Sequence, residues 1–392
     1  MLARLLSEGF RAFFLLTLLA GLGLMGLWLV LLSRDYFALA GQALPIGPVA
    51  MHWHGHEMLF GFAGAATAGF LLTAVPNWTG AAPARRGFIT LLAALWLAGR
   101  GVMLVSGLLP GWLVAAVSLA FWPVLAAQVI VMLARRPMAR NMVFLVLLGG
   151  FALAQALVHA DWLGLGWGDS GRGLRAGLML FAAMIAVIGG RIVPAFTRNA
   201  LARRAASGPP PAEPGRLDAL GRLAALATAL ALLPPLPDSV AGLAALVAGG
   251  LALARLSRWR GRATLGEPIL WVLHLSFGFL GLGYLAWGLA RLGFGSEVAA
   301  MHLLAIGAVA GMVLAVLSRA SLGHAGRALI APRPLALAYG LMPVSALLRW
   351  LSPLAGSLEP LFILAAGVAW LGALGLALAS LAPVLAGPRA GA

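Results

Sequence analysis

Residues 13–30 read Phe-Phe-Leu-Leu-Thr-Leu-Leu-Ala-Gly-Leu-Gly-Leu-Met-Gly-Leu-Trp-Leu-Val and contain no charged side chain. In helical form, about 20 such residues cover the roughly 30 Å of hydrocarbon in a lipid bilayer. Arg4 and Arg11 precede the stretch, and no Ala-x-Ala cleavage signal bounds it. We therefore interpret it as a first membrane span rather than a cleaved signal peptide.

The whole chain has the same apolar character. Of its 392 residues, 62% are hydrophobic and 10% are charged, whereas a water-soluble globule is about half apolar and a quarter charged. The apolar runs are continuous rather than alternating, which excludes a membrane β-barrel. The composition predicts an all-α polytopic membrane protein with about twelve spans.

Arginine, proline and glycine punctuation divides the apolar runs into twelve predicted helices. The Pro-rich stretch 207–216 is the one linker in the pattern. It separates a predicted first six-helix half, residues 1–206, from a second, residues 217–392, within a single membrane domain. The helices are expected near 10–33, 54–76, 87–108, 111–133, 141–160, 174–194, 218–236, 238–256, 267–291, 297–318, 333–352 and 360–385.

The formal charge of +16 is the balance of 27 basic residues, all of them arginine, and 11 acidic residues. They occur in small clusters between apolar spans, so positive-inside topology explains them better than nucleic-acid binding. With twelve spans, about 21 of the 27 arginines fall on one side of the membrane. We expect both termini on the cytoplasmic side of a bacterial inner membrane, and no nucleic-acid partner.

Histidine is the residue type that carries possible chemistry. The chain has seven histidines and no cysteine, and three of the histidines lie within Met51-His-Trp-His-Gly-His-Glu-Met58. Without cysteine, thiolate haem ligation and iron–sulfur clusters are excluded, whereas imidazole binds copper, zinc and haem iron. The segment therefore predicts a metal or haem site near the outer membrane face, although interfacial decoration is the alternative interpretation.

The spacing limits how this cluster can act. In a helix, His52 and His56 share a face, while His54 points the other way, so at most two of the three serve one metal ion. Glu57 follows directly, where its carboxylate can accept a hydrogen bond from a ligating imidazole or relay protons. Simple solvation of Glu57 at the interface is equally compatible with the sequence.

Further candidates lie in the later spans. His302 is expected near the outer face, His274 near the cytoplasmic face, and His324 on the cytoplasmic side. His274 and His302 are predicted to lie more than about 10 Å apart, too far to share one small ion. Arg100, Arg191 and Arg349 are candidate counter-ions for haem propionates, because the guanidinium fork fits a carboxylate. The common alternative is that these side chains extend to the lipid headgroups.

Four stretches resemble one family of membrane proteins. They are Trp53–Gly61, Gly69–Gly80, Gly190–Asn199, and His302–Arg327, which ends in Ser318-Arg-Ala-Ser-Leu-Gly-His-Ala-Gly-Arg327. In this order they are similar to the NnrS family of haem- and copper-containing bacterial membrane proteins. The resemblance extends over both halves of the chain.

The resemblance implies a twelve-helix inner-membrane protein that contains haem b and copper and that acts in nitric oxide metabolism and nitrosative stress. Its best-matched histidines are His54, His56 and His302, followed by His274 and His324. His52 and His159 are not carried over. The first hypothesis is iron held between the second and tenth spans, copper on neighbouring His or Met, and nitric oxide as ligand.

Two alternatives stay open at this point. One is a transporter of haem, copper or a small solute that is built from two six-helix halves. Pro76 and Pro194 favour it because they could break helices, whereas the scarcity of buried acidic residues disfavours it. The other is an assembly factor for haem or copper. Whether the protein turns over a substrate or only binds one is also open, and the electron donor is unspecified.

Overall fold

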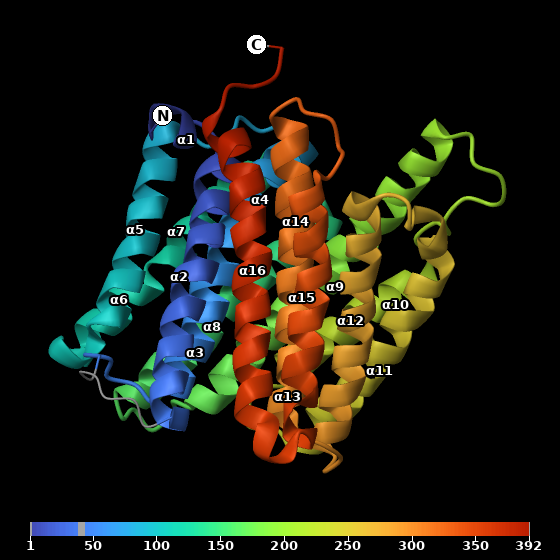
Figure 1. Cartoon of the computed structure of the whole chain (residues 1–392). Helices are drawn as coiled ribbons and strands as arrows, with labels where there is room; N and C mark the ends of the chain where they lie inside the picture. Colours follow the sequence, from blue (N-terminus) through green and yellow to red (C-terminus); the bar gives the residue numbers. More distant parts are fainter. Residues whose placement is uncertain (1, 38–43, 392) are drawn as a thin grey trace. The chain divides into compact units, whose positions relative to one another are not determined.

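The structure, a computed structural model, describes residues 2–37 and 44–391 (Figure 1). Over this part of the chain all regular elements are helices. Eleven of them are long and apolar enough to cross a membrane, which confirms the predicted all-α polytopic class. They are Gly9–Arg34, Ala50–Thr79, Arg86–Leu104, Gly111–Ala134, Ala139–Trp162, Ser170–Arg203, Asp238–Trp259, Pro268–Arg291, Glu297–His324, Arg333–Leu354 and Gly356–Ala386.

The remaining predicted span, 218–236, forms the shorter helix α10, Arg216–Leu230. Its 15 residues rise about 22 Å, less than the hydrocarbon thickness of roughly 30 Å. Arg11 lies near the start of α2 (Gly9–Phe37). Its guanidinium donates to the carbonyl oxygens of Leu385 at 2.7 Å and Gly387 at 2.9 Å, at the end of α16 (Glu359–Ala386). The start of α2 and the end of α16 therefore meet, which requires an even number of membrane crossings between them and supports α10 as the twelfth.

Contacts divide the chain into two compact units. Unit 1 comprises Met1–Gly177, Ala320–Arg327 and Leu378–Ala392, and unit 2 comprises Leu178–Arg319 and Ala328–Ala377. The boundary falls inside α9 (Ser170–Arg203) instead of in the linker. The predicted six-helix halves, 1–206 and 217–392, stay a prediction about the order of the spans.

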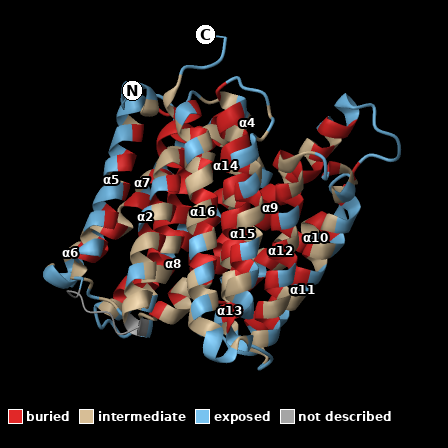
Figure 2. Ribbon diagram, in the orientation of Figure 1, coloured by how far each residue is buried: buried red, intermediate tan, exposed pale blue. Residues whose placement is uncertain are grey.

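Unit 1 is built on α4, Gly64–Thr79, which packs against α2 and α7, Phe121–Ala134. A Cβ atom at Gly69 would lie 2.6 Å from the ring of Phe14, so only glycine allows this approach of α4 to α2. The helices α5 (Arg86–Leu104), α6 (Gly111–Leu119) and α8 (Ala139–Trp162) complete its core. Figure 2 shows buried residues along their inner faces.

In unit 2, α11 (Asp238–Leu256) packs closely along α12 (Pro268–Arg291). A Cβ atom at Gly249 would lie 2.8 Å from the Gly281 carbonyl oxygen, and one at Gly288 would lie 2.8 Å from that of Gly242. Small residues that let two backbones approach are the usual packing device between helices in a membrane.

A buried ion pair fixes α10 in unit 2. Arg255 of α11 donates from Nε to Asp218 Oδ1 at 3.0 Å and from Nη2 to the Ala186 carbonyl at 3.0 Å. Both charged side chains are buried. The pair joins the short helix to two longer neighbours.

Two spans change helix type immediately after a histidine. The α-helix α3, Ala50–His56, becomes the π-helix η1, Glu57–Ala63, before α4 begins. In the same way α13, Glu297–His302, becomes the π-helix η5, Leu303–Ala310, and then α14, Gly311–His324. Both spans are among the three most buried of the eleven. π-Helical turns are rare and often mark functional sites.

The chain between α9 and α10 is not helical. Arg260 holds it by donating to the carbonyl oxygens of Pro209 at 2.7 Å and Ser207 at 2.9 Å. The remaining elements are α1 (Leu2–Leu5), η2 (Ser106–Leu108), η3 (Ser257–Trp259), η4 (Gly261–Thr264), α15 (Arg333–Leu351), η6 (Ser352–Leu354) and η7 (Gly356–Leu358).

Candidate functional site

His56 and Glu57 occupy the junction between α3 and η1, and both side chains are fully buried in unit 1. The Nδ1 atom of His56 lies 2.9 Å from Glu57 Oε1. A hydrogen bond from an imidazole to Glu57 was one of the alternatives that the sequence left open. Buried polar groups require such partners because the hydrocarbon around a membrane protein supplies none.

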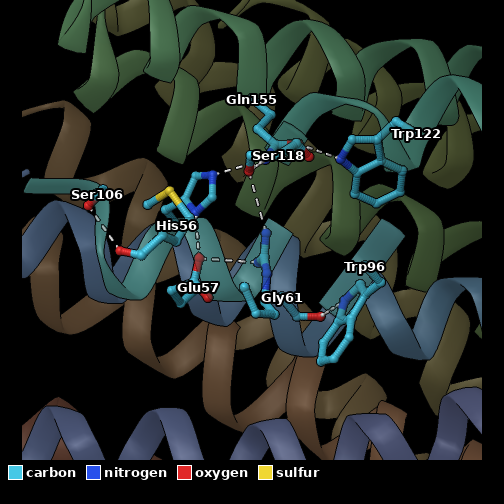
Figure 3. A network of polar contacts seen from close by, with 10 residues as sticks. His56, Glu57, Gly61, Trp96, Ser106, Ser118, Trp122 and Gln155 are labelled. Atoms are coloured by element: carbon cyan, nitrogen blue, oxygen red, sulfur yellow. Dashed lines mark hydrogen bonds and ion pairs between the residues drawn. The ribbon is translucent and has the colours of Figure 1, made fainter. Parts of the chain in front are cut away.

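The other side of the His56 ring faces Gln155 of α8 (Figure 3). Trp122 Nε1, which only donates, lies 2.8 Å from Gln155 Oε1, so the amide NH₂ group must face the opposite way. That group donates to Ser118 Oγ at 2.8 Å and to His56 Nε2 at 2.9 Å. His56 therefore carries its proton on Nδ1, donates it to Glu57, and presents its lone pair at Nε2.

Arg100 of α5 supplies the positive charge at this site. Its Nη1 atom lies 3.2 Å from Glu57 Oε1, and its Nη2 atom donates to Ser118 Oγ at 3.5 Å. A Cβ atom at Gly61 would lie 2.8 Å from Arg100 Nη1, so the bare backbone of η1 makes room for the guanidinium. Glu57 Oε2 and Arg100 Nε are buried without a hydrogen-bond partner.

His159 lies beside this network, four residues after Gln155 on the same helix. Its ring centroid is 5.2 Å from that of His56, with the two planes at 80°. Trp162 adds a third ring, 5.2 Å from His159 and 5.4 Å from His56. The Nε2 atom of His159 is buried and has no hydrogen-bond partner.

The other two histidines of the cluster go elsewhere in unit 1. His54 stacks on Trp28 of α2, with ring centroids 4.4 Å apart and planes at 15°. His52 Nδ1 lies 3.1 Å from Ser170 Oγ. Because α3 is a regular α-helix, His54 faces away from His56, as the spacing predicted.

His324 lies far from these residues although it belongs to the same unit. Its ring is 5.4 Å from Phe10, near the start of α2, whereas His54 contacts Trp28 of that helix. Eighteen residues separate Phe10 and Trp28, which corresponds to about 27 Å along a helix. His324 and His54 therefore do not hold the same ion.

The candidate histidines of unit 2 are also separate from each other. His302 Nδ1 donates to the Val298 carbonyl at 2.7 Å, and His274 Nε2 lies 2.8 Å from Thr197 Oγ1. A Cβ atom at Gly283 of α12 would touch Leu304, which shows where the two helices meet. His274 lies nine residues, about 14 Å, beyond that point, so the expected separation from His302 is present.

Two of the three arginines proposed for propionates, Arg191 and Arg349, lie in unit 2, whereas Arg100 lies in unit 1. Arg349 is half-buried near the end of α15, where its Nη1 atom donates to Ser352 Oγ at 3.0 Å. Arg191 is half-buried within α9. These observations do not test the propionate assignment, which stays a prediction. A cofactor shared by His56 and His302 also stays a prediction.

His56 and His302 share one arrangement. Each ends an α-helix, precedes a π-helix, and has Nδ1 bonded to an oxygen of the protein, a carboxylate for His56 and a carbonyl for His302. That bond assigns the ring lone pair to Nε2, as in many metal-ligating histidines. Among the described residues, no group of three or more His, Asp or Glu side chains is placed to hold a metal ion.

Three parts of this site were not predicted from the sequence: Gln155, Ser118 and the pairing of Arg100 with Glu57. Gln155 is an isolated amide in the apolar run 141–160, four residues before His159, and this spacing was an available signal. Arg100 was considered only as a propionate partner. Nothing local in the sequence indicates its pairing with Glu57, 43 positions earlier.

These features define a multi-pass helical membrane protein with imidazoles, a carboxylate and a guanidinium buried among its spans. A family model described as NnrS protein matches residues 4–389, so the chain belongs to the NnrS family. At the level of the family, this membership supports a membrane protein linked to nitric oxide. No curated protein matches the chain.

Proposed function

We propose that the protein binds haem b and copper within the membrane and uses them to bind nitric oxide or nitrosyl species, which relieves nitrosative stress. The observation that carries this proposal is the state of His56. The side chain is fully buried, its Nδ1–H donates to Glu57, and its lone pair at Nε2 accepts from the Gln155 amide. A carboxylate behind an imidazole orients the ring and raises its basicity toward a metal.

The donor set fits these groups. Haem b iron and copper both accept neutral imidazole, and the chain has no cysteine to supply a thiolate. The residues that would hold the groups are His56 and His302, with His54 as a further candidate. When bound, a ferrous haem supplies an iron atom that takes nitric oxide as a ligand.

The protein's own residues then perform three tasks. Glu57 holds the His56 ring in one tautomer, and Arg100 balances the Glu57 charge in a buried region. The apolar surroundings admit nitric oxide, because it is small, uncharged and soluble in lipid. Charged molecules are excluded from the same region.

The test is the optical spectrum and metal content of the purified protein. We expect a Soret band that shifts on titration with nitric oxide, together with bound copper. The His56→Ala and His54→Ala proteins should lose haem or copper while remaining in the membrane, and His302→Ala should change the spectrum. His52→Ala, a histidine of the same helix bonded to Ser170, is the matched control and should keep both.

Two results contradict the proposal. Unchanged metal content in the His54 and His56 variants would exclude the ligand assignment. A colourless wild-type protein that catalyses flux of a solute into vesicles would favour the transporter alternative.

We also propose an inner-membrane location with both termini in the cytoplasm. Because the chain has no cysteine, a single introduced thiol reports one position. Ser207→Cys, in the exposed linker, should react with an impermeant maleimide only in inverted vesicles. Ser357→Cys, exposed between α15 and α16, should react only in spheroplasts. The reverse pattern would invert the topology.

A further inference from the structure

We propose that His56 and His159 form a site for one cuprous ion, bound by the Nε2 atoms of the two imidazoles. The inference rests on the proposed copper content and names the residues that hold the ion. His159 was not among the candidates from sequence or family resemblance. The structure places it against His56 and leaves its Nε2 atom unpartnered.

The unpartnered nitrogen is the first argument. His159 is 3% exposed, and a buried polar atom without a hydrogen-bond partner destabilises the folded protein. The neighbouring Gln155 amide spends its N–H groups on Ser118 and His56. A cation bound at Nε2 of His159 would supply the partner that this atom lacks.

The three rings are the second argument. His56, His159 and Trp162 have mutual centroid distances of 5.2, 5.2 and 5.4 Å, so both imidazoles and an indole pack directly against one another in unit 1. Imidazole nitrogens are good copper ligands, and an indole ring adds attraction for a cation near its face. The region is buried, which protects the cuprous state from water and oxidants.

The number of donors selects the metal. Zinc in proteins prefers four ligands, and in the described chain no cluster of three or more His, Asp or Glu side chains is placed to hold an ion. Cuprous copper, with a filled d shell, is stable with two nitrogen ligands. Glu57 does not join them, because it contacts Nδ1 of His56, on the other side of the ring from the Nε2 atom that would bind the ion.

Gln155 competes with the ion. Its amide now donates to His56 Nε2, and the ion would take that lone pair while Gln155 keeps its bond to Ser118 Oγ. A Gln155→Leu protein, which lacks the competing N–H group and adds no sulfur ligand, should therefore bind cuprous copper at least as tightly as the wild type.

The experiment measures binding of the ion itself. Metal-free protein in detergent is titrated anaerobically with copper and ascorbate against a chromophoric Cu(I) chelator. Loss of a direct ligand should weaken binding by at least about 100-fold in His159→Ala and His56→Ala, since removing outer hydrogen-bond partners alone weakens metal sites by 10–100-fold. The control, His52→Ala, should bind as the wild type does.

Copper X-ray absorption of the wild type gives a second readout that needs no variant. Two imidazole nitrogens as nearest neighbours support the site, and sulfur or oxygen neighbours overturn it. Wild-type copper affinity in a folded His159→Ala protein, or in His159→Gln if the alanine variant does not fold, also overturns it. If copper and a haem spectrum persist without His159, only this inference fails. If the wild type holds neither group, the proposed function fails as well.

Discussion

The Arg100→Met protein is expected to lose about 3–5 kcal/mol of stability, because the substitution leaves the Glu57 carboxylate buried without the guanidinium 3.2 Å away. Methionine preserves most of the side-chain volume, so the effect reports the charge rather than a cavity. Glu57 is fully buried and has one oxygen without a hydrogen-bond partner even in the wild type. Thermal unfolding of the purified protein in detergent measures the change.

Two variants separate the ion pair from other effects of Arg100→Met. Arg86→Met, at the exposed start of the same helix α5, should change stability by no more than about 0.5 kcal/mol. Adding Glu57→Gln to Arg100→Met removes the uncompensated charge and should recover much of the loss. An Arg100→Met protein as stable as Arg86→Met would show that this pair does not hold unit 1 together.

In unit 2, the Asp218→Asn protein is expected to lose a similar 3–5 kcal/mol, because Arg255 is then buried without its carboxylate. Asp218 has a second role, since its Oδ2 atom accepts from the Gly215 N–H at 3.1 Å and caps α10. Asparagine retains an acceptor for that cap, so the neutralised charge accounts for most of the expected loss. The same thermal unfolding measurement checks it.

The matched control is Glu213→Gln, which removes the carboxylate of a surface ion pair in the segment just before α10. Arg198 lies 2.9 Å from Glu213, whose side chain is 76% exposed. Exposed pairs contribute roughly 0–1 kcal/mol, so Glu213→Gln should have little effect. Equal midpoints for Asp218→Asn and Glu213→Gln would contradict the argument, because both substitutions remove one negative charge from a carboxylate–arginine pair.

Most of the fold follows from apolar run length. A run of about 20 residues has to cover the bilayer, so eleven of the predicted spans have counterparts in the structure. The short helix α10 is the predicted span whose length does not follow from its apolar run. Its run is interrupted by Pro234, Pro235 and Pro237, and a buried charge pair, invisible to hydropathy, holds it in place.

The candidate site was less predictable for a different reason. The α-helical period correctly separated His54 from His56, because that relation lies within one helix. Contacts between helices depend on their relative rotation and depth, so Glu57–Arg100 and His56–Gln155 were beyond the reach of a single sequence. The two π-helices add a residue to a turn, which changes the faces that follow, and no residue pattern announces them.

The bond between Arg11 and the carbonyl groups of α16 also bears on the order in which unit 1 assembles. Arg11 and Leu385 are 374 positions apart, so translation makes α2 long before α16. Until α16 is made, the Arg11 guanidinium has the Glu8 carboxylate 2.7 Å from its Nε atom but lacks the carbonyl acceptors of Leu385 and Gly387. Unit 1 is therefore completed only after α16 has entered the bilayer.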